Sequence, residues 1–185
     1  MSVGILIGVV AVGAVLLGLR SVRPKSPVGI DAGNASAGLR EGVLSRTMLS
    51  GVTAESPDAP IGAVMDWNVG SGLATLVAIV DGTVSLYVTP GGGTIGAGTR
   101  AEVAAAATTF RMVTSRAATH FRATSEYPAP SPDTVVFYLL FRDKTLSTGP
   151  LPVADLTSPT HPLAVVGGAA QALLTQVRRA SQQAA

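Results

Sequence analysis

The sequence predicts an α+β fold in which an N-terminal single transmembrane helix is followed by a soluble domain with an antiparallel sheet, made of two hairpins flanked by helices. Three observations support this. Residues 3–19 carry no charge. Residues 73–89 and 134–147 each resemble two strands joined by a turn. Residues 99–122 and 161–180 have the apolar spacing of amphipathic helices.

The length of 185 residues leaves room for one ordinary domain with appendages. The predicted organisation follows the changes in composition along the chain. It comprises a transmembrane anchor at residues 1–20, a Pro/Gly-rich linker at 21–38, a soluble α+β domain at 39–180 and a tail at 181–185.

Composition excludes several kinds of site. The chain has no cysteine, which excludes disulfides, thiolate nucleophiles and cysteine-held metals. Its two histidines, His120 and His161, are too few for a three-histidine metal centre. The formal net charge of +2 is too small to indicate nucleic acid binding. We therefore predict no cofactor, no metal and no nucleic acid partner.

The first predicted element is the anchor. At ~1.5 Å per residue, residues 3–19 nearly match a hydrocarbon layer of ~30 Å. A secretory signal peptide would carry its positive charges before the apolar run. Here Arg20, Arg23 and Lys25 follow it and form the predicted membrane interface. The positive-inside rule then places the domain on the cytoplasmic side of the cell's inner membrane.

Two glycines suggest that this helix packs against protein. Gly4 and Gly8 have the small-xxx-small spacing that lets membrane helices approach closely, although glycine is also common in membrane helices generally. The predicted partners are therefore other membrane protein subunits as well as the lipid bilayer.

The soluble part is expected to begin after an extended linker. Residues 39–49 predict a short amphipathic helix with Leu39, Val43 and Met48 on one face and Arg40 and Glu41 elsewhere. Residues 61–67 form a weaker strand candidate.

The first hairpin is the clearest element of the domain. Residues 73–80 are rich in β-forming types, and Asp81-Gly82 supplies the two residues that a type I′ turn requires. Residues 83–89 alternate apolar and polar types, as a half-buried return strand does. Residues 134–141 and 145–147 predict the second hairpin.

Two helices complete the expected domain. Thr99 and Glu102 have the spacing of a capping box and open the helix predicted at 99–122. The last helix, at 161–180, contains Gly167 and Gly168, which weaken a helix but permit close packing.

Motifs with chemical meaning give little support for catalysis. Residues 91–96 match G-x-G-x-x-G, but the preceding strand closes a hairpin and no acidic residue follows at ~20 residues, so a flexible loop is favoured over a dinucleotide site. No G-x-S-x-G is present. We expect His120 inside a helix and His161 at a helix start. The aspartates are expected in loops or turns: Asp58, Asp66, Asp81, Asp133, Asp143 and Asp155. We predict no catalytic residue.

The element order of residues 39–180 resembles the roadblock, longin and profilin group of small α+β domains: helix, Asp81-Gly82 hairpin, Gly-rich loop, long helix, strand pair, final helix. The resemblance implies a non-catalytic docking or dimerisation platform, with a homodimer through the sheet or helices as one form. Several members of these families are associated with small GTPases. The resemblance rests on element order, so it assigns no site residue.

The function expected from the sequence is that of a non-enzymatic, membrane-anchored accessory subunit that stabilises a larger membrane complex, with photosynthetic or respiratory assemblies as reasonable hosts. A roadblock-like regulator of a small GTPase is the alternative, and an unrecognised enzyme is the third. Arg178 and Arg179 fit either an anionic partner or a solvated helix end.

Overall fold

The computed structural model describes residues 32–89 and 92–183. Three α-helices and eight short strands are interspersed with single turns of 3-10 helix. The helices are α1 (Ala32–Leu44), α2 (Ala101–Arg116) and α3 (Ala164–Gln183), with 3-10 turns η2 (Thr47–Leu49), η3 (Ala97–Thr99), η4 (Ala118–His120) and η5 (Val153–Thr157). The strands are β1 (Gly62–Asn68), β2 (Leu73–Ile79), β3 (Val84–Val88), β4 (Gly93–Ile95), β5 (Arg122–Thr124), β6 (Thr134–Leu140), β7 (Thr145–Ser147) and β8 (Leu151–Pro152).

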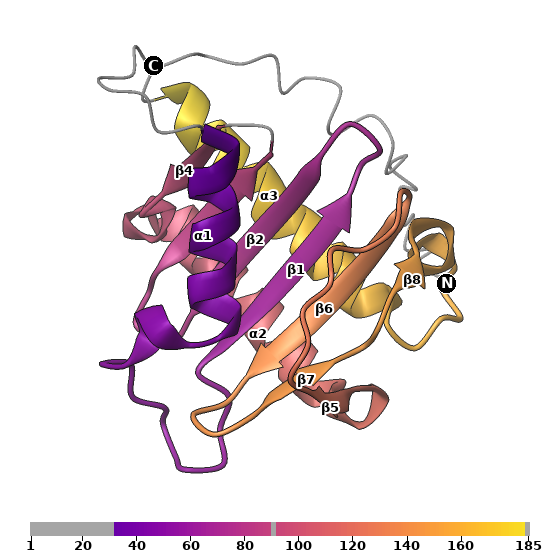
Figure 1. Ribbon diagram of the computed structural model, residues 1–185, viewed down its shortest axis with the longest axis horizontal. Coiled ribbons are helices and arrows are strands. Elements are labelled where there is room, and N and C mark those ends of the chain that lie inside the picture. Colours follow the sequence, from indigo (N-terminus) through magenta and orange to yellow (C-terminus); the bar gives the residue numbers. More distant parts are fainter. Residues whose placement is uncertain (1–31, 90–91, 184–185) are drawn as a thin grey trace, which may run out of the picture.

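All eight strands belong to one antiparallel sheet. Its order is β4-β3-β2-β1-β6-β7-β5, and β8 pairs with β6 beyond the end of β7. The first and second halves of the chain meet at the centre, where β1 pairs with β6 from Gly62↔Leu140 to Trp67↔Val135. Figure 1 shows α1 on one face of this sheet and α2 with α3 on the other.

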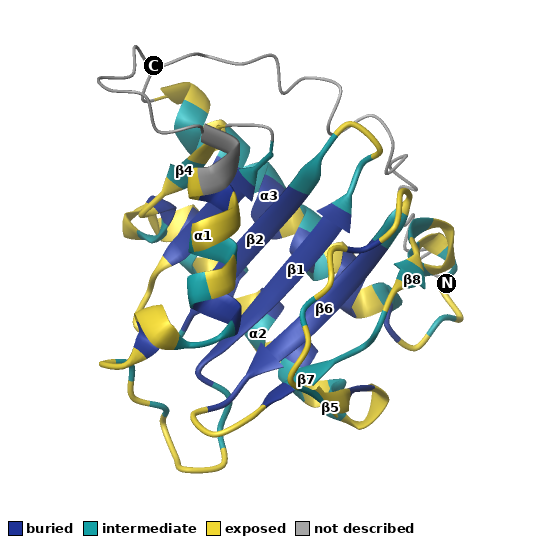
Figure 2. Ribbon diagram, viewed as in Figure 1, coloured by how far each residue is buried: buried dark blue, intermediate teal, exposed yellow. Residues whose placement is uncertain are grey.

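Both faces of the central strands are buried, as Figure 2 shows. Successive side chains of a strand point to opposite faces. In β1, Ala63, Met65 and Trp67 pack with the α2/α3 core, whereas Val64 packs with the core beneath α1. A sheet covered on both sides needs apolar residues at nearly every position, which explains the almost continuous apolar runs in β2 and β6.

The α2/α3 face is closed by two long helices. Val103, Ala107 and Phe110 of α2 are buried against the sheet, and the Phe110 ring lies 6.4 Å from that of Phe137 in β6. At Gly167 of α3 an added Cβ would lie 3.1 Å from Cβ of Leu156, so this glycine permits the close approach that the sequence suggested.

The α1 face is covered differently. The helix α1 packs Val43 and Leu44 over one end of the sheet. The segment 125–133, which we call the β5–β6 connection, runs across the same face in an extended form (Figure 1). One short helix and one extended segment therefore cover the area that two long helices cover on the opposite side.

The hairpin at Asp81-Gly82 is confirmed, but its predicted type I′ turn is wrong. That turn needs a positive φ at both residues, and among the described non-glycine residues only Arg46 and Asp133 have one. The strands β2 and β3 pair from Ala74↔Val88 to Ala78↔Val84. Gly82 has a φ of 92°, and the Thr83 amide donates to Oδ1 of Asp81 over 2.8 Å. These two features are the reasons why this dipeptide favours a tight turn.

Several predicted boundaries are corrected. The helix α1 begins at Ala32, so residues 32–38 of the predicted linker are helical. The predicted capping box is wrong, because Thr99 belongs to η3 and the N-cap of α2 is Arg100, without a side-chain cap. The helix α2 ends at Arg116, before the expected residue 122, because the chain turns through η4 into β5.

The predicted fold class also needs correction. The chain has the expected α+β fold with an antiparallel sheet, and the strands outside the two predicted hairpins join the same sheet. Among the described residues, no helix has both the length and the apolar character needed to cross a membrane. This finding contradicts the fold class headed by a transmembrane helix and the single-pass membrane character that accompanied it. The predicted anchor at residues 1–20 lies outside the described residues.

Candidate functional site

The α1 face of the sheet changes character from one end to the other. At one end Val64, Val77 and Leu140 form an apolar core with α1. At the other end the same strands carry polar side chains. Asp66 of β1 lies directly opposite Thr75 of β2 in the sheet register. Because residues two apart share a face, a single strand supplies both the apolar and the polar end.

Asp66 is the most deeply buried charged residue of the described chain, with none of its surface exposed. Arg40 of α1 reaches down to it. The Oδ2 atom of Asp66 lies 2.8 Å from Nε and 2.6 Å from Nη2 of Arg40. The hydroxyl of Thr75 donates to Oδ1 over 2.6 Å. Both carboxylate oxygens therefore have partners, as a buried charge requires.

Burial dominates the titration of this carboxyl group. Removal from water raises the pKa of Asp66 above its ordinary value of 3.8, although the charge and hydrogen bonds of Arg40 and the Thr75 hydroxyl oppose the rise. Burial and the nearby Asp66 charge likewise raise the pKa of the Tyr138 phenol, in β6, to about 12. At the polar end of the α1 face, exclusion of water therefore disfavours the charged forms of both groups.

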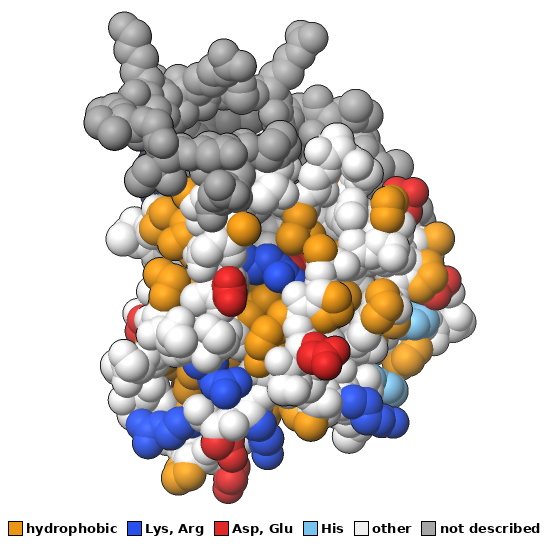
Figure 3. Space-filling model, viewed as in Figure 1, with side chains coloured by type: hydrophobic (Ala, Val, Ile, Leu, Met, Phe, Trp, Pro, Cys, Tyr) orange, Lys and Arg blue, Asp and Glu red, His pale blue; other side chains and the backbone are white. Residues whose placement is uncertain are grey.

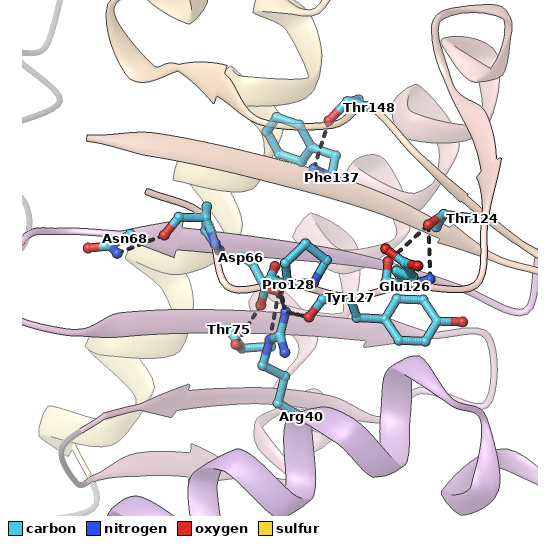
Figure 4. A network of polar contacts seen from close by, with 11 residues as sticks. Arg40, Asp66, Asn68, Thr75, Thr124, Glu126, Tyr127, Pro128, Phe137 and Thr148 are labelled. Carbon is cyan, nitrogen blue, oxygen red and sulfur yellow. Dashed lines mark hydrogen bonds and ion pairs between the residues drawn. The ribbon is translucent and has the colours of Figure 1, made fainter. Parts of the chain in front are cut away.

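Arg40 also holds the β5–β6 connection (Figure 4). Its Nη2 donates to the carbonyl oxygens of Tyr127 over 2.9 Å and of Pro128 over 3.3 Å. Two further contacts fix the same segment. Nδ2 of Asn68 donates to the Pro130 carbonyl over 2.8 Å. The ring of Tyr127 packs edge-on against that of Tyr138, with centroids 6.0 Å apart. One guanidinium thus joins α1, the sheet and the connection.

A cleft of about 440 Å³ lies between these elements. We call it the α1 cleft. Its volume falls within the range of about 300–1,000 Å³ that is usual for ligand pockets. Figure 3 views this face and shows a few charged side chains among hydrophobic ones over the sheet. The cleft is lined by Ser36, Ala37, Arg40, Glu41, Leu73, Thr75, Tyr87, Thr89, Tyr127 and Ala129.

Two charged groups of the cleft retain binding capacity. Nε and Nη2 of Arg40 are occupied by Asp66 and the two carbonyls, while Nη1 makes no hydrogen bond within the described part of the chain. Glu41, the next residue of α1, is exposed, and its carboxylate forms no ion pair with any described residue. The cleft therefore offers unused guanidinium donors beside an unpaired carboxylate.

The buried carboxyl group of Asp66 is closed to a substrate. General acid–base chemistry needs a titratable group within hydrogen-bond reach of a substrate. Asp66 is enclosed beneath Arg40 and Thr75, and each of its oxygens is already bonded. Within the described residues, no three His, Cys, Asp or Glu side chains gather as metal ligands would.

The predicted membrane-interface residues Arg20, Arg23 and Lys25 and the helix-packing residues Gly4 and Gly8 lie outside the described residues. They therefore remain predictions.

The glycine-rich stretch 91–96 is partly described. Gly93–Ile95 forms β4, the edge strand that pairs with β3. Gly93 has a φ of 142°, and a Cβ there would collide with the carbonyl oxygen of Leu86. Gly93 thus allows tight strand pairing in a segment where a flexible loop was expected.

The two histidines are remote from the α1 cleft. His120 ends η4 and is exposed. Nδ1 of His161 accepts a hydrogen bond from the Leu163 amide over 3.2 Å, just before α3 begins. His161 therefore accepts a hydrogen bond from a backbone amide at the start of this helix, as expected of a local structural residue.

Sequence reasoning missed both Arg40, which lines the cleft, and Asp66, which is buried beneath it. The assignment of Asp66 to a loop or turn was wrong, because β1 extends to Asn68. The available signal was an aspartate inside the apolar run 61–67, where a buried carboxylate demands a cationic partner. Nothing in the spacing identified Arg40 as that partner, since the two residues are 26 positions apart.

Comparison with protein-family models, with curated proteins and with solved structures gives no match for this chain. The resemblance to roadblock, longin and profilin domains stays a prediction.

Proposed function

We propose that this domain is a non-enzymatic accessory module that docks onto a larger protein assembly, and that the α1 cleft receives the C-terminus of a partner polypeptide. The proposal keeps the docking role expected from the sequence and does not depend on a membrane anchor.

The proposal is supported mainly by the position of the Arg40–Asp66 ion pair, which joins the elements around the cleft. Its hydrogen bonds tie α1 to β1 and to the β5–β6 connection, and α1 and the connection both supply lining residues of the cleft. A preformed recess reduces the ordering cost of binding, which is the main obstacle to recognition of short segments. The Arg40–Asp66 pair therefore serves to keep the α1 cleft in a shape ready to bind a partner segment.

The choice of occupant follows from the donors that remain. Arginine is suited to carboxylates because its planar group presents several N–H donors in a fixed geometry. Nη1 of Arg40 has no acceptor among the described residues and can donate to such a group. Capture of a terminal carboxylate is an established mode of peptide recognition. Leu73, Tyr87 and Ala129 supply the apolar part of the lining for the terminal side chain.

Filling the cleft tests this proposal. Ala37 is an exposed residue of α1 that lines the cleft, and Ala105 is an exposed residue of α2 on the opposite side of the sheet. In the full chain, Ala37→Trp should abolish co-purification of partner subunits from the native cells, whereas Ala105→Trp should retain them. Quantitative mass spectrometry of both variants makes the comparison.

The two tryptophans are matched in residue type, helical setting and exposure. Equal recovery of the same partners with both variants would show that docking does not use the α1 cleft.

A further inference from the structure

The charge of the cleft restricts which C-terminus fits. Arg40 and Asp66 together carry no net charge when both are ionised, so among the described residues that line the cleft Glu41 supplies the remaining charge. A carboxylate entering alone would meet the donors of Arg40 but would also bring a second negative charge beside Glu41. Like charges at close range disfavour such a complex. A carboxylate accompanied by a cation avoids this penalty.

The positions of Arg40 and Glu41 set the spacing of the two ligand charges. They are consecutive residues of α1, and both line the cleft. A ligand that satisfies both must present its carboxylate and its cation within the reach of one side chain. Tyr87 and Tyr127 also line the cleft, and the faces of tyrosine rings attract ammonium and guanidinium groups.

We propose that the α1 cleft selects a C-terminus whose last residue is lysine or arginine. Nη1 of Arg40 receives the terminal carboxylate, and Glu41 receives the cationic end of the side chain. This inference rests on the proposed docking function and specifies its ligand.

Three synthetic peptides test it with the full-length chain. They are acetyl-Gly-Ala-Gly-Lys with a free carboxylate, the same peptide amidated, and acetyl-Gly-Ala-Gly-Leu with a free carboxylate. Amide NMR titration to millimolar concentration gives the affinities. The lysine carboxylate should shift Thr75, Tyr87 and Thr89, and both amidation and the exchange for leucine should weaken binding about tenfold.

Glu41→Gln isolates the contribution of the rim carboxylate. It should reduce the affinity for the lysine peptide to about the level of the leucine peptide. Glu55→Gln provides the matched control, since Glu55 is exposed and does not line the cleft. It should leave the affinity unchanged.

The results separate the two proposals. If none of the peptides shifts cleft residues at millimolar concentration, both the docking function and the inference are overturned. If the lysine and leucine carboxylates bind equally and Glu41→Gln has no effect, docking stands and the selection of a basic terminus is refuted. If free lysine binds as tightly as the peptide, the occupant is a free amino acid, and docking of a chain terminus is refuted.

Discussion

The two faces of the sheet are built from the same strands but are closed in opposite ways. On the α2/α3 face two long helices bury a continuous apolar core. On the α1 face one short helix and the β5–β6 connection cover a surface that is apolar at one end and polar at the other. Apolar packing closes a face completely, whereas a buried ion pair needs directed partners. The polar end is where the α1 cleft lies.

The largest expected change in stability comes from a substitution on the α2/α3 face. Phe110→Ala removes a fully buried ring that packs on Phe137, so we expect a loss of about 3–5 kcal/mol in the free energy of unfolding. Met112→Ala, at an exposed position of the same helix, should change it by less than about 0.5 kcal/mol. Urea unfolding of both variants measures the difference, and similar losses would contradict the assignment of this face as the main core.

At the polar end of the α1 face, removing one member of the Arg40–Asp66 pair should lower the free energy of unfolding more than removing both. Asp66→Leu leaves Arg40 without its counter-ion in a half-buried site, so we expect a loss of about 3 kcal/mol. The double variant Asp66→Leu with Arg40→Met leaves no unpaired charge and should recover much of that loss. Urea midpoints provide the comparison. A double variant less stable than Asp66→Leu alone would mean that the pair contributes net stability.

The free energy of unfolding should depend on pH through Asp66, a buried titratable group on the α1 face. Because the folded-state pKa of Asp66 is raised, the folded chain binds more protons than the unfolded chain between the ordinary pKa of 3.8 and the raised folded-state pKa. Stability contributed by the protonated form is present below the ordinary pKa and is lost as the pH rises through the folded pKa. Arg40→Met removes the main opposing charge, so the loss should extend to higher pH.

Urea unfolding of the Arg40→Met variant between pH 4 and 7 shows whether its stability falls as the pH rises. The reference is the double variant Arg40→Met with Asp66→Asn, which lacks the titrating group and should show none of the added pH dependence. If the Arg40→Met variant follows the same pH profile as this reference, the raised pKa of Asp66 is refuted.

The smallest expected effect distinguishes two adjacent glycines of α3. A Cβ at Gly168 meets no atom within 4 Å, so Gly168→Ala should stabilise the chain by about 0.5–1 kcal/mol through reduced freedom of the unfolded state. Gly167→Ala should gain less or destabilise, because its Cβ would press on Leu156. Thermal unfolding of the two variants gives the order, and a larger gain for Gly167→Ala would contradict the close packing of α3 against η5.

Local features of the chain were predictable to different degrees. The Asp81-Gly82 turn was recognised because its requirements are met by adjacent residues. The role of Asp66 was missed because the Arg40 contact depends on how α1 crosses the sheet. The β5–β6 connection contains Pro128, Pro130 and Pro132, which disfavour regular structure, but its course across the α1 face depends on hydrogen bonds to Arg40 and Asn68.

The hairpins, the amphipathic helices and the mixed α+β class could be predicted from the amino-acid sequence, because they follow from periodicity and turn chemistry within short windows. The order of the strands in the sheet, the unequal closure of its two faces and the meeting of Arg40 with Asp66 beside a cleft are seen only in the folded chain. Those outcomes depend on contacts between residues far apart in the chain, and no local pattern encodes their pairing.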